Sequence, residues 1–162
     1  MAVVHGSRSA SDEERIWFNG ALVTVRVASA DTGKAFNLVE VLARGGHATP
    51  LHRDPNCETF HLLDGEMLFH VAGREIRATA GDTVVVPTGT AHAFLVMSPL
   101  ARYMVVNVPG GHDGFFRAGG VPAPRAELPP PAPPDFARVN AAAAEFGIET
   151  LGPPPFAQGA RP

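Results

Sequence analysis

The segment Gly46–Gly65, with the sequence GHATPLHRDPNCETFHLLDG, brings a histidine, an aspartate and a glutamate close together, namely His52, Asp54 and Glu58. His52 and Asp54 are two residues apart, so on an extended segment both side chains point to the same face. Glu58 follows beyond Pro55–Asn56, where the chain can turn inward at the start of the next strand. A metal site needs several donor side chains on one frame, and this segment supplies most of them.

A second, shorter segment completes the predicted site. Gly81–His92, GDTVVVPTGTAH, contains an apolar strand and a Pro-Thr-Gly turn that precede His92. His52, Asp54 and His92 together form the two-histidine, one-carboxylate set that is typical of non-haem Fe(II) oxygenases. Glu58 is then predicted to be a fourth ligand or a catalytic acid or base beside the metal.

Short apolar segments separated by turn signals fill most of the chain up to residue 108. Asn19-Gly20 between two apolar runs is a strong hairpin signal, and the alternation in Leu22–Val27 is typical of a half-buried strand. The expected strands are 15–18, 21–28, 36–43, 58–63, 66–71, 74–79, 82–86, 91–97 and 102–108. Many short strands at regular spacing predict an all-β protein, either a sandwich or a barrel.

The C-terminal part has a different pattern, with prolines concentrated after Gly120. Asp113–Arg117 is expected to form one helical turn, and Phe136–Phe146 a helix that Asp135 caps and Gly147 ends. The apolar face of that helix is predicted to contain Phe136, Val139, Ala143 and Phe146. We therefore expect a flexible leader at 1–14, a barrel at 15–120, and a Pro-rich linker with a C-terminal helix at 121–162. A helix this short is marginal alone, so it should pack on the barrel or on a partner subunit.

The composition excludes several classes of function. The chain has 162 residues, of which 45% are hydrophobic and 18% charged, so one domain can bury a core. A net charge of −3 gives no basic surface for nucleic acid, and no apolar run is long enough to span a membrane. Cys57 is the single cysteine, so no intrachain disulfide can form. We expect a soluble, cytoplasmic protein.

The two segments resemble the two motifs of the cupin superfamily. The first motif is Gly, five residues, His-x-His, three or four residues, Glu, six residues, Gly; the second is Gly, five residues, Pro-x-Gly, two residues, His, three residues, Asn. Eight positions match at the correct spacing: Gly46, His52, Glu58, Gly65, Gly81, Pro87, Gly89 and His92. Asp54 stands in place of the second histidine of the first motif, and Val96 in place of the asparagine. This resemblance implies a cupin fold, a double-stranded β-helix or jelly-roll barrel.

The chain is also similar to a bacterial branch of the superfamily that resembles quercetin 2,3-dioxygenase. The likeness rests on Trp17–Gly20, on Pro109–Phe116 and on Phe146–Pro154. It implies a homodimer, an apolar cavity for a small-molecule substrate, and a divalent metal held by three histidines and one glutamate.

Carried over by position, His52, Glu58 and His92 are expected metal ligands. Asp54 departs from the pattern, and it is either a fourth ligand through oxygen or a residue that points away from the ion. An oxygen ligand favours Fe(II) or Mn(II), with Ni, Co, Cu or Zn as alternatives.

The resemblance implies a metal-dependent oxygenase that acts on a small aromatic, flavonol-like or polyketide-like enol, with Glu58 moving a proton. Two alternatives stay open: a non-oxidative cyclase, isomerase or decarboxylase, and a metal-free binding protein. Among the other histidines, His61 is expected to face away from the cavity and His47 to be structural. His5 and His112 are expected to be exposed.

Overall fold

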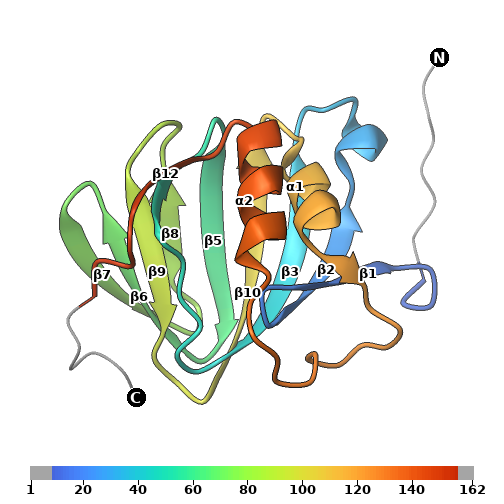
Figure 1. Ribbon diagram of the computed structural model, residues 1–162, viewed down its shortest axis with the longest axis horizontal. Helices are drawn as coiled ribbons and strands as arrows, with labels where there is room; N and C mark the ends of the chain where they lie inside the picture. The colour runs from blue at the N-terminus through green and yellow to red at the C-terminus, as the bar shows by residue number, and fades with distance from the viewer. Residues whose placement is uncertain (1–8, 157–162) are drawn as a thin grey trace.

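The computed structural model describes residues 9–156, and within them the chain forms two antiparallel sheets (Figure 1). The larger sheet has the strand order β11 (Val121–Pro122), β1 (Glu14–Phe18), β2 (Ala21–Val27), β3 (Asn37–Arg44), β10 (Leu100–Val108), β5 (Cys57–Asp64) and β8 (Thr83–Val86). The smaller sheet has the order β12 (Glu149–Gly152), β4 (Leu51–Arg53), β9 (His92–Val96), β6 (Glu66–Val71) and β7 (Arg74–Thr79). The helices are a short 3-10 helix, η1 (Ser29–Thr32), and two α-helices, α1 (His112–Gly119) and α2 (Phe136–Glu145). Most of the expected leader, His5 and the last six residues of the chain lie outside the described residues.

This arrangement confirms the predicted all-β cupin barrel. The two sheets face each other and enclose one large apolar core, to which β2, β3, β5, β6 and β9 contribute buried side chains. In β5 the alternation is as predicted: Glu58, Phe60 and Leu62 point inward, whereas His61 is exposed and bonds Thr83. Because a strand has a side-chain period of two, Glu58 is thereby directed into the barrel.

The turn after β5 requires a glycine at position 65. Its φ is +88°, and a Cβ there would lie 2.4 Å from the carbonyl oxygen of Leu100 and 2.6 Å from Ser98 Oγ. A side chain would therefore be strained and would also collide with the neighbouring loop. The first motif ends at this glycine because the barrel closes tightly around it.

The strand β4 was not predicted, although it carries His52. It has only three residues and lies between Pro50 and Pro55. A segment so short and so close to two prolines gives no recognisable strand pattern in the sequence. It pairs with β9 through His52 and His92, and on its other edge with β12 through Thr150. The C-terminal strand is thus the edge strand of the sheet that holds both site histidines.

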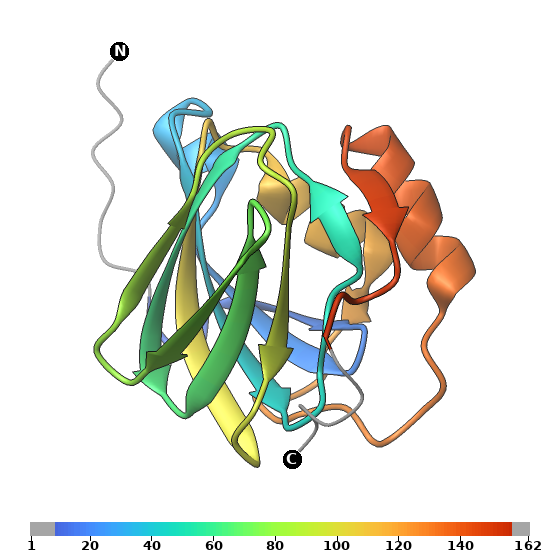
Figure 2. The ribbon, with the colours of Figure 1, turned by 90° about the vertical axis from the view of Figure 1, so that its left-hand side faces the viewer.

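The C-terminal elements pack on the same side of the barrel (Figure 2). In α2 the predicted N-cap is confirmed, since Asp135 Oδ1 accepts a hydrogen bond from the Arg138 amide at 3.0 Å. Phe136, however, is 63% exposed, so its prediction as part of the buried face is wrong. The packed face consists of Val139, Ala142, Ala143 and Phe146, which contact α1 and the Phe18 region.

Helix α1 is longer than the single predicted turn, because it begins at His112 and ends at Gly119. Its start is held to η1, where Asp113 accepts hydrogen bonds from the Ser29 amide and hydroxyl. Within residues 9–156, none of the helices has the length and apolar character needed to cross a membrane.

Candidate metal centre

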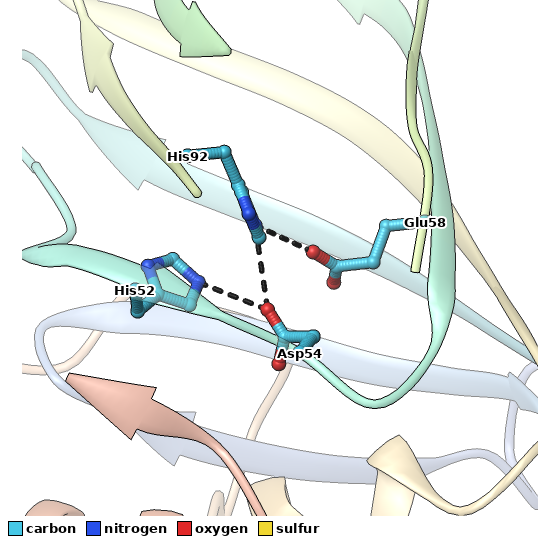
Figure 3. Close-up of side chains that lie close together, drawn as sticks. All are labelled: His52, Asp54, Glu58 and His92. Carbon is cyan, nitrogen blue, oxygen red and sulfur yellow. Dashed lines mark ion pairs between the residues drawn. The ribbon is translucent and has the colours of Figure 1, made fainter. Parts of the chain in front are cut away.

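Four side chains from three strands and one loop converge inside the barrel (Figure 3). His52 comes from β4, His92 from β9 and Glu58 from β5, while Asp54 lies in the loop between β4 and β5. One donor atom from each of these residues lies within 4.8 Å of all the others. The sequence-predicted ligands are therefore brought together, Asp54 included.

The shortest separations are those expected of ligands around one ion. His92 Nε2 lies 2.8 Å from Glu58 Oε2 and 3.3 Å from Asp54 Oδ2, and His52 Nε2 lies 3.1 Å from the same Asp54 oxygen. Two atoms that each lie about 2.0–2.2 Å from a metal are at most about 4.4 Å apart. These three contacts satisfy that limit.

Both histidines are oriented by backbone carbonyls. His52 Nδ1 lies 2.8 Å from the Pro50 oxygen, and His92 Nδ1 lies 2.8 Å from the Thr90 oxygen. A carbonyl only accepts, so each Nδ1 carries the proton and Nε2 is directed to the carboxylates. This arrangement is common for metal-binding imidazoles, in which one ring nitrogen donates to the protein and the other binds the ion.

The carboxylates have fewer hydrogen-bond partners than buried charges need. Asp54 and Glu58 are both less than 5% exposed, and Asp54 Oδ1 and Oδ2, Glu58 Oε2 and His92 Nε2 have no hydrogen-bond partner among the described residues. Burying unpaired carboxylates is costly unless a cation or proton compensates them. The donor set of two imidazoles and two carboxylates therefore fits a divalent cation.

His52 and Asp54 influence each other's protonation in the absence of metal. Burial lowers the pKa of His52, but the close contact with the negatively charged Asp54 outweighs it, so the pKa is raised above the ordinary 6.5. Burial raises the pKa of Asp54, but the close contact with His52 and the charge of His112 reverse this, so the pKa falls below its ordinary value. In the absence of a cation, a proton on His52 thus compensates part of the negative charge of the buried carboxylates.

These residues line an apolar cavity of about 120 Å³. Its walls include Phe60, Phe94 and Tyr103 from the barrel, and Val139 and Ile148 from the C-terminal part. Burial, followed by the charge of Glu58, raises the pKa of Tyr103, so its phenol stays protonated. The C-terminal segment is consequently part of the cavity wall.

His112 was expected to be exposed, and this is wrong. It is buried at the start of α1, lines the cavity, and packs edge-on against Phe115 and Phe116. Its Nδ1 lies 3.6 Å from Asp54 Oδ1 and its Nε2 3.9 Å from Glu58 Oε1. Both motifs end before residue 112, but His112 lies within the Pro109–Phe116 segment whose resemblance to the quercetin 2,3-dioxygenase-like branch could have drawn attention to it.

His47 lines the cavity as well, although it was expected to be structural. Burial lowers the pKa of His47 to about 4, so the ring is neutral near pH 7. Its ring lies 5.9 Å from that of Phe94. Within residues 9–156 no ion pair with a carboxylate links His47 to the metal centre, so its place is in the cavity wall.

Comparisons with known proteins agree with this fold. Residues 38–106 match the family model of the cupin domain. A stretch of 79 residues is 33% identical to quercetin 2,3-dioxygenase of Bacillus subtilis, and it covers 49% of this chain but only 23% of that protein. The match and the barrel together support the cupin superfamily.

Solved structures with the same fold are distant in sequence. An RmlC-like cupin from Shewanella frigidimarina has a TM-score of 0.58 at 17% identity, covering 68% of this chain and 96% of that one. A Streptomyces PAC13 variant solved with uridine has a TM-score of 0.55 at 19% identity, covering 66% of this chain and 84% of that one. At this identity the likeness shows the fold alone.

Proposed function

We propose that this cupin-fold chain is a metal-dependent oxygenase that binds one divalent cation through His52, Asp54, Glu58 and His92. The observation that carries the proposal is the set of buried donor atoms that lack hydrogen-bond partners at the base of an apolar cavity. Oxygen ligands from two carboxylates favour Fe(II) or Mn(II) over softer ions. The partial match to a quercetin 2,3-dioxygenase supports oxygenase chemistry at such a centre.

A bound cation would supply Lewis acidity toward an enol or phenol oxygen and, when redox-active, a route for electrons to O2. The residues around it perform the other tasks. Glu58, the expected catalytic residue, accepts the enol proton on Oε1, which keeps a second lone pair beside the one that accepts from Asn107. Tyr103 donates a hydrogen bond to a substrate oxygen, because its phenol stays protonated. Phe60 and Phe94 exclude water from the reacting atoms.

The cavity size restricts the substrate class. Pockets for drug-sized ligands occupy about 300–1,000 Å³, whereas this cavity encloses about 120 Å³. A single-ring phenol or a small enolisable diketone therefore suits the cavity better than a three-ring flavonol. A flavonol would require displacement of α2 and β12 from the cavity wall.

Asp54 also favours a second candidate, a non-oxidative enzyme in which the ion acts only as a Lewis acid. Carboxylate-rich sites suit cations such as Mg²⁺ and Mn²⁺, which can act without a change of oxidation state. Isomerisation or decarboxylation of the same class of enol would then consume no O2.

Oxygen uptake distinguishes the two candidates. Protein loaded anaerobically with Fe(II) or Mn(II) is mixed with catechol, acetylacetone or quercetin, and O2 consumption is followed together with substrate loss. We expect O2 uptake that Glu58→Gln abolishes and that His61→Asn, on the outer face of β5, leaves unchanged. Substrate loss without O2 uptake would favour the non-oxidative candidate. If no metal supports either O2 uptake or substrate loss, both candidates are contradicted.

A further inference from the structure

We propose that Asn37 and Asn107 are positioning residues that set the direction of the Glu58 carboxylate. Both asparagines are fully buried, and they face each other as a cross-strand pair of β3 and β10. Asn107 also lies opposite Glu58 in the pairing of β10 with β5. This inference rests on the proposed metal centre and adds residues outside both cupin motifs.

The hydrogen bonds form a chain whose direction is set at the backbone. The amides of Gly111 and His112 both donate to Asn37 Oδ1 at 3.2 Å. A backbone N–H only donates, so Asn37 must turn its oxygen toward α1 and its Nδ2 toward the barrel. The amide orientation of Asn37 is therefore determined by its surroundings.

The same logic continues to Glu58. Asn37 Nδ2 donates to Asn107 Oδ1 at 3.1 Å, so Asn107 must present its own Nδ2 on the other side. That group donates to Glu58 Oε1 at 3.0 Å. Oε1 is thereby engaged, and Oε2, which lies 2.8 Å from His92 Nε2, is the oxygen left for the cation. Glu58 is consequently a ligand through one oxygen, with its second oxygen held by the protein.

One isosteric change reverses this chain without touching Glu58 or Asn107. In Asn37→Asp one carboxylate oxygen still accepts from the Gly111 and His112 amides. The other oxygen, which replaces Nδ2, can only accept a hydrogen bond from Asn107. Asn107 must then turn its Nδ2 toward residue 37 and its Oδ1 toward Glu58 Oε1. Two acceptors facing each other repel, so Glu58 leaves the direction that binding requires.

A control variant separates positioning from simple anchoring of α1. Asp113→Asn is also isosteric and lies at the start of the same helix, where it weakens the contacts to Ser29 and Arg117. It leaves the Asn37–Asn107–Glu58 chain in place. If α1 anchoring alone mattered, the two variants would behave alike.

The test is the Kd for Co(II), measured by titration of chelator-treated protein, together with the Co(II) absorption spectrum. Loss of an outer hydrogen-bond partner typically costs about 10–100-fold in metal affinity. We expect that loss, with an altered spectrum, for Asn37→Asp and for Asn107→Leu, while Asp113→Asn stays close to wild type. Asn107→Leu removes the donor with a larger side chain of the same branched shape, and it serves if Asn37→Asp does not fold.

The outcomes separate this inference from the proposed function. Wild-type affinity and spectrum in both asparagine variants would overturn the positioning role while leaving the metal centre intact. If wild-type protein binds no Co(II), Mn(II) or Fe(II), the proposed function fails instead. In that case the side-chain amide protons of Asn107 are followed by NMR in metal-free protein. Slow exchange in wild type, with shifted Asn107 amide resonances in Asn37→Asp, would support the chain. Rapid exchange in wild type, or unshifted resonances in the variant, would overturn it.

Discussion

At the scale of single residues, Asp54 determines the character of the site. It is 3% exposed, and its Oδ2 contacts both His52 and His92 at ion-pair distance. Its replacement of an imidazole gives the centre two carboxylates. The centre therefore has more negative charge and harder ligand atoms than a site of three histidines and one glutamate.

Asp54→His tests this role directly. An imidazole at this position would restore a nitrogen donor and remove one buried negative charge. We expect the Kd for Co(II) or Ni(II) to fall by at least about tenfold, equal to about 1.4 kcal/mol. Titration calorimetry measures it, and an unchanged Kd would show that residue 54 does not touch the ion.

The His52–Asp54 pair predicts a pH dependence for the metal-free protein. The pKa of His52 is raised, so its contribution to stability is complete below the ordinary 6.5 and is lost as the pH rises through the folded value. The pKa of Asp54 is lowered, so its contribution is complete above the ordinary 3.8 and is lost as the pH falls through the folded value. Wild type should therefore exceed Asp54→Asn in stability mainly between about pH 3.8 and 6.5.

Urea unfolding in the presence of a chelator measures this difference across the pH range. If His52 and Asp54 form a pair, the stability advantage of wild type over Asp54→Asn should shrink both below about pH 3.8 and above about pH 6.5. A difference between the two proteins that stays constant from pH 3 to pH 9 would refute the pairing.

Single residues also show how far the sequence leads. Motif spacing, together with the resemblance to the cupins, predicted that His52, Asp54, Glu58 and His92 converge, because short-range periodicity and turn residues influence where side chains point. His112, Asn37 and Asn107 were missed, since they reach the centre through strand pairing and through the return of α1, which are long-range contacts. A histidine or asparagine carries no local signal of such a contact.

At the scale of elements, the unexpected feature is how the C-terminal segment takes part in the site. Helix α2 was predicted from its periodicity, N-cap and closing glycine. Strand β12 was not predicted, and neither was the role of α2 in the cavity wall, because Pro-rich surroundings suggested a loose extension. In the structure β12 pairs with β4, which carries His52, while α2 closes the cavity against α1.

Gly114→Ala should loosen the packing of α2 and β12 on the barrel. A Cβ at Gly114 would lie 2.4 Å from Phe146 Cε1 and 2.7 Å from Cζ. Alanine gains up to about 1 kcal/mol of helix propensity over glycine, whereas overpacking costs about 1–3 kcal/mol. We expect net destabilisation together with faster amide hydrogen exchange in α2 and β12.

Gly152→Ala is the matched control, because a Cβ there meets no atom within 4 Å. Its exchange rates in α2 should equal those of wild type. If Gly114→Ala leaves amide exchange in α2 unchanged or slows it, close packing between α1 and Phe146 is not what holds α2 on the barrel.

At the scale of the whole molecule, metal binding and stability should be linked. The four proposed ligands come from β4, β5, β9 and one loop and so link the two sheets; an ion that binds only the folded state should therefore stabilise the entire barrel. At a free metal concentration of about 100 times Kd the gain is about 2.7 kcal/mol. For a domain of this size that corresponds to a rise in Tm of about 5–10 °C.

Thermal unfolding with Mn(II), compared with unfolding in chelator, measures this rise. Glu58→Gln should reduce it strongly, whereas His61→Asn, on the exposed side of the same strand, should retain it. An equal rise in wild type and Glu58→Gln would assign the stabilisation to another site.

The most direct test of the account is the stoichiometry of divalent metal bound to chelator-treated protein, measured by titration with Mn(II) and Co(II) for wild type, His92→Ala and His61→Asn. The account predicts one ion per chain in wild type and in His61→Asn, with binding lost in His92→Ala. Absence of binding in wild type, or binding that persists without His92, would contradict it.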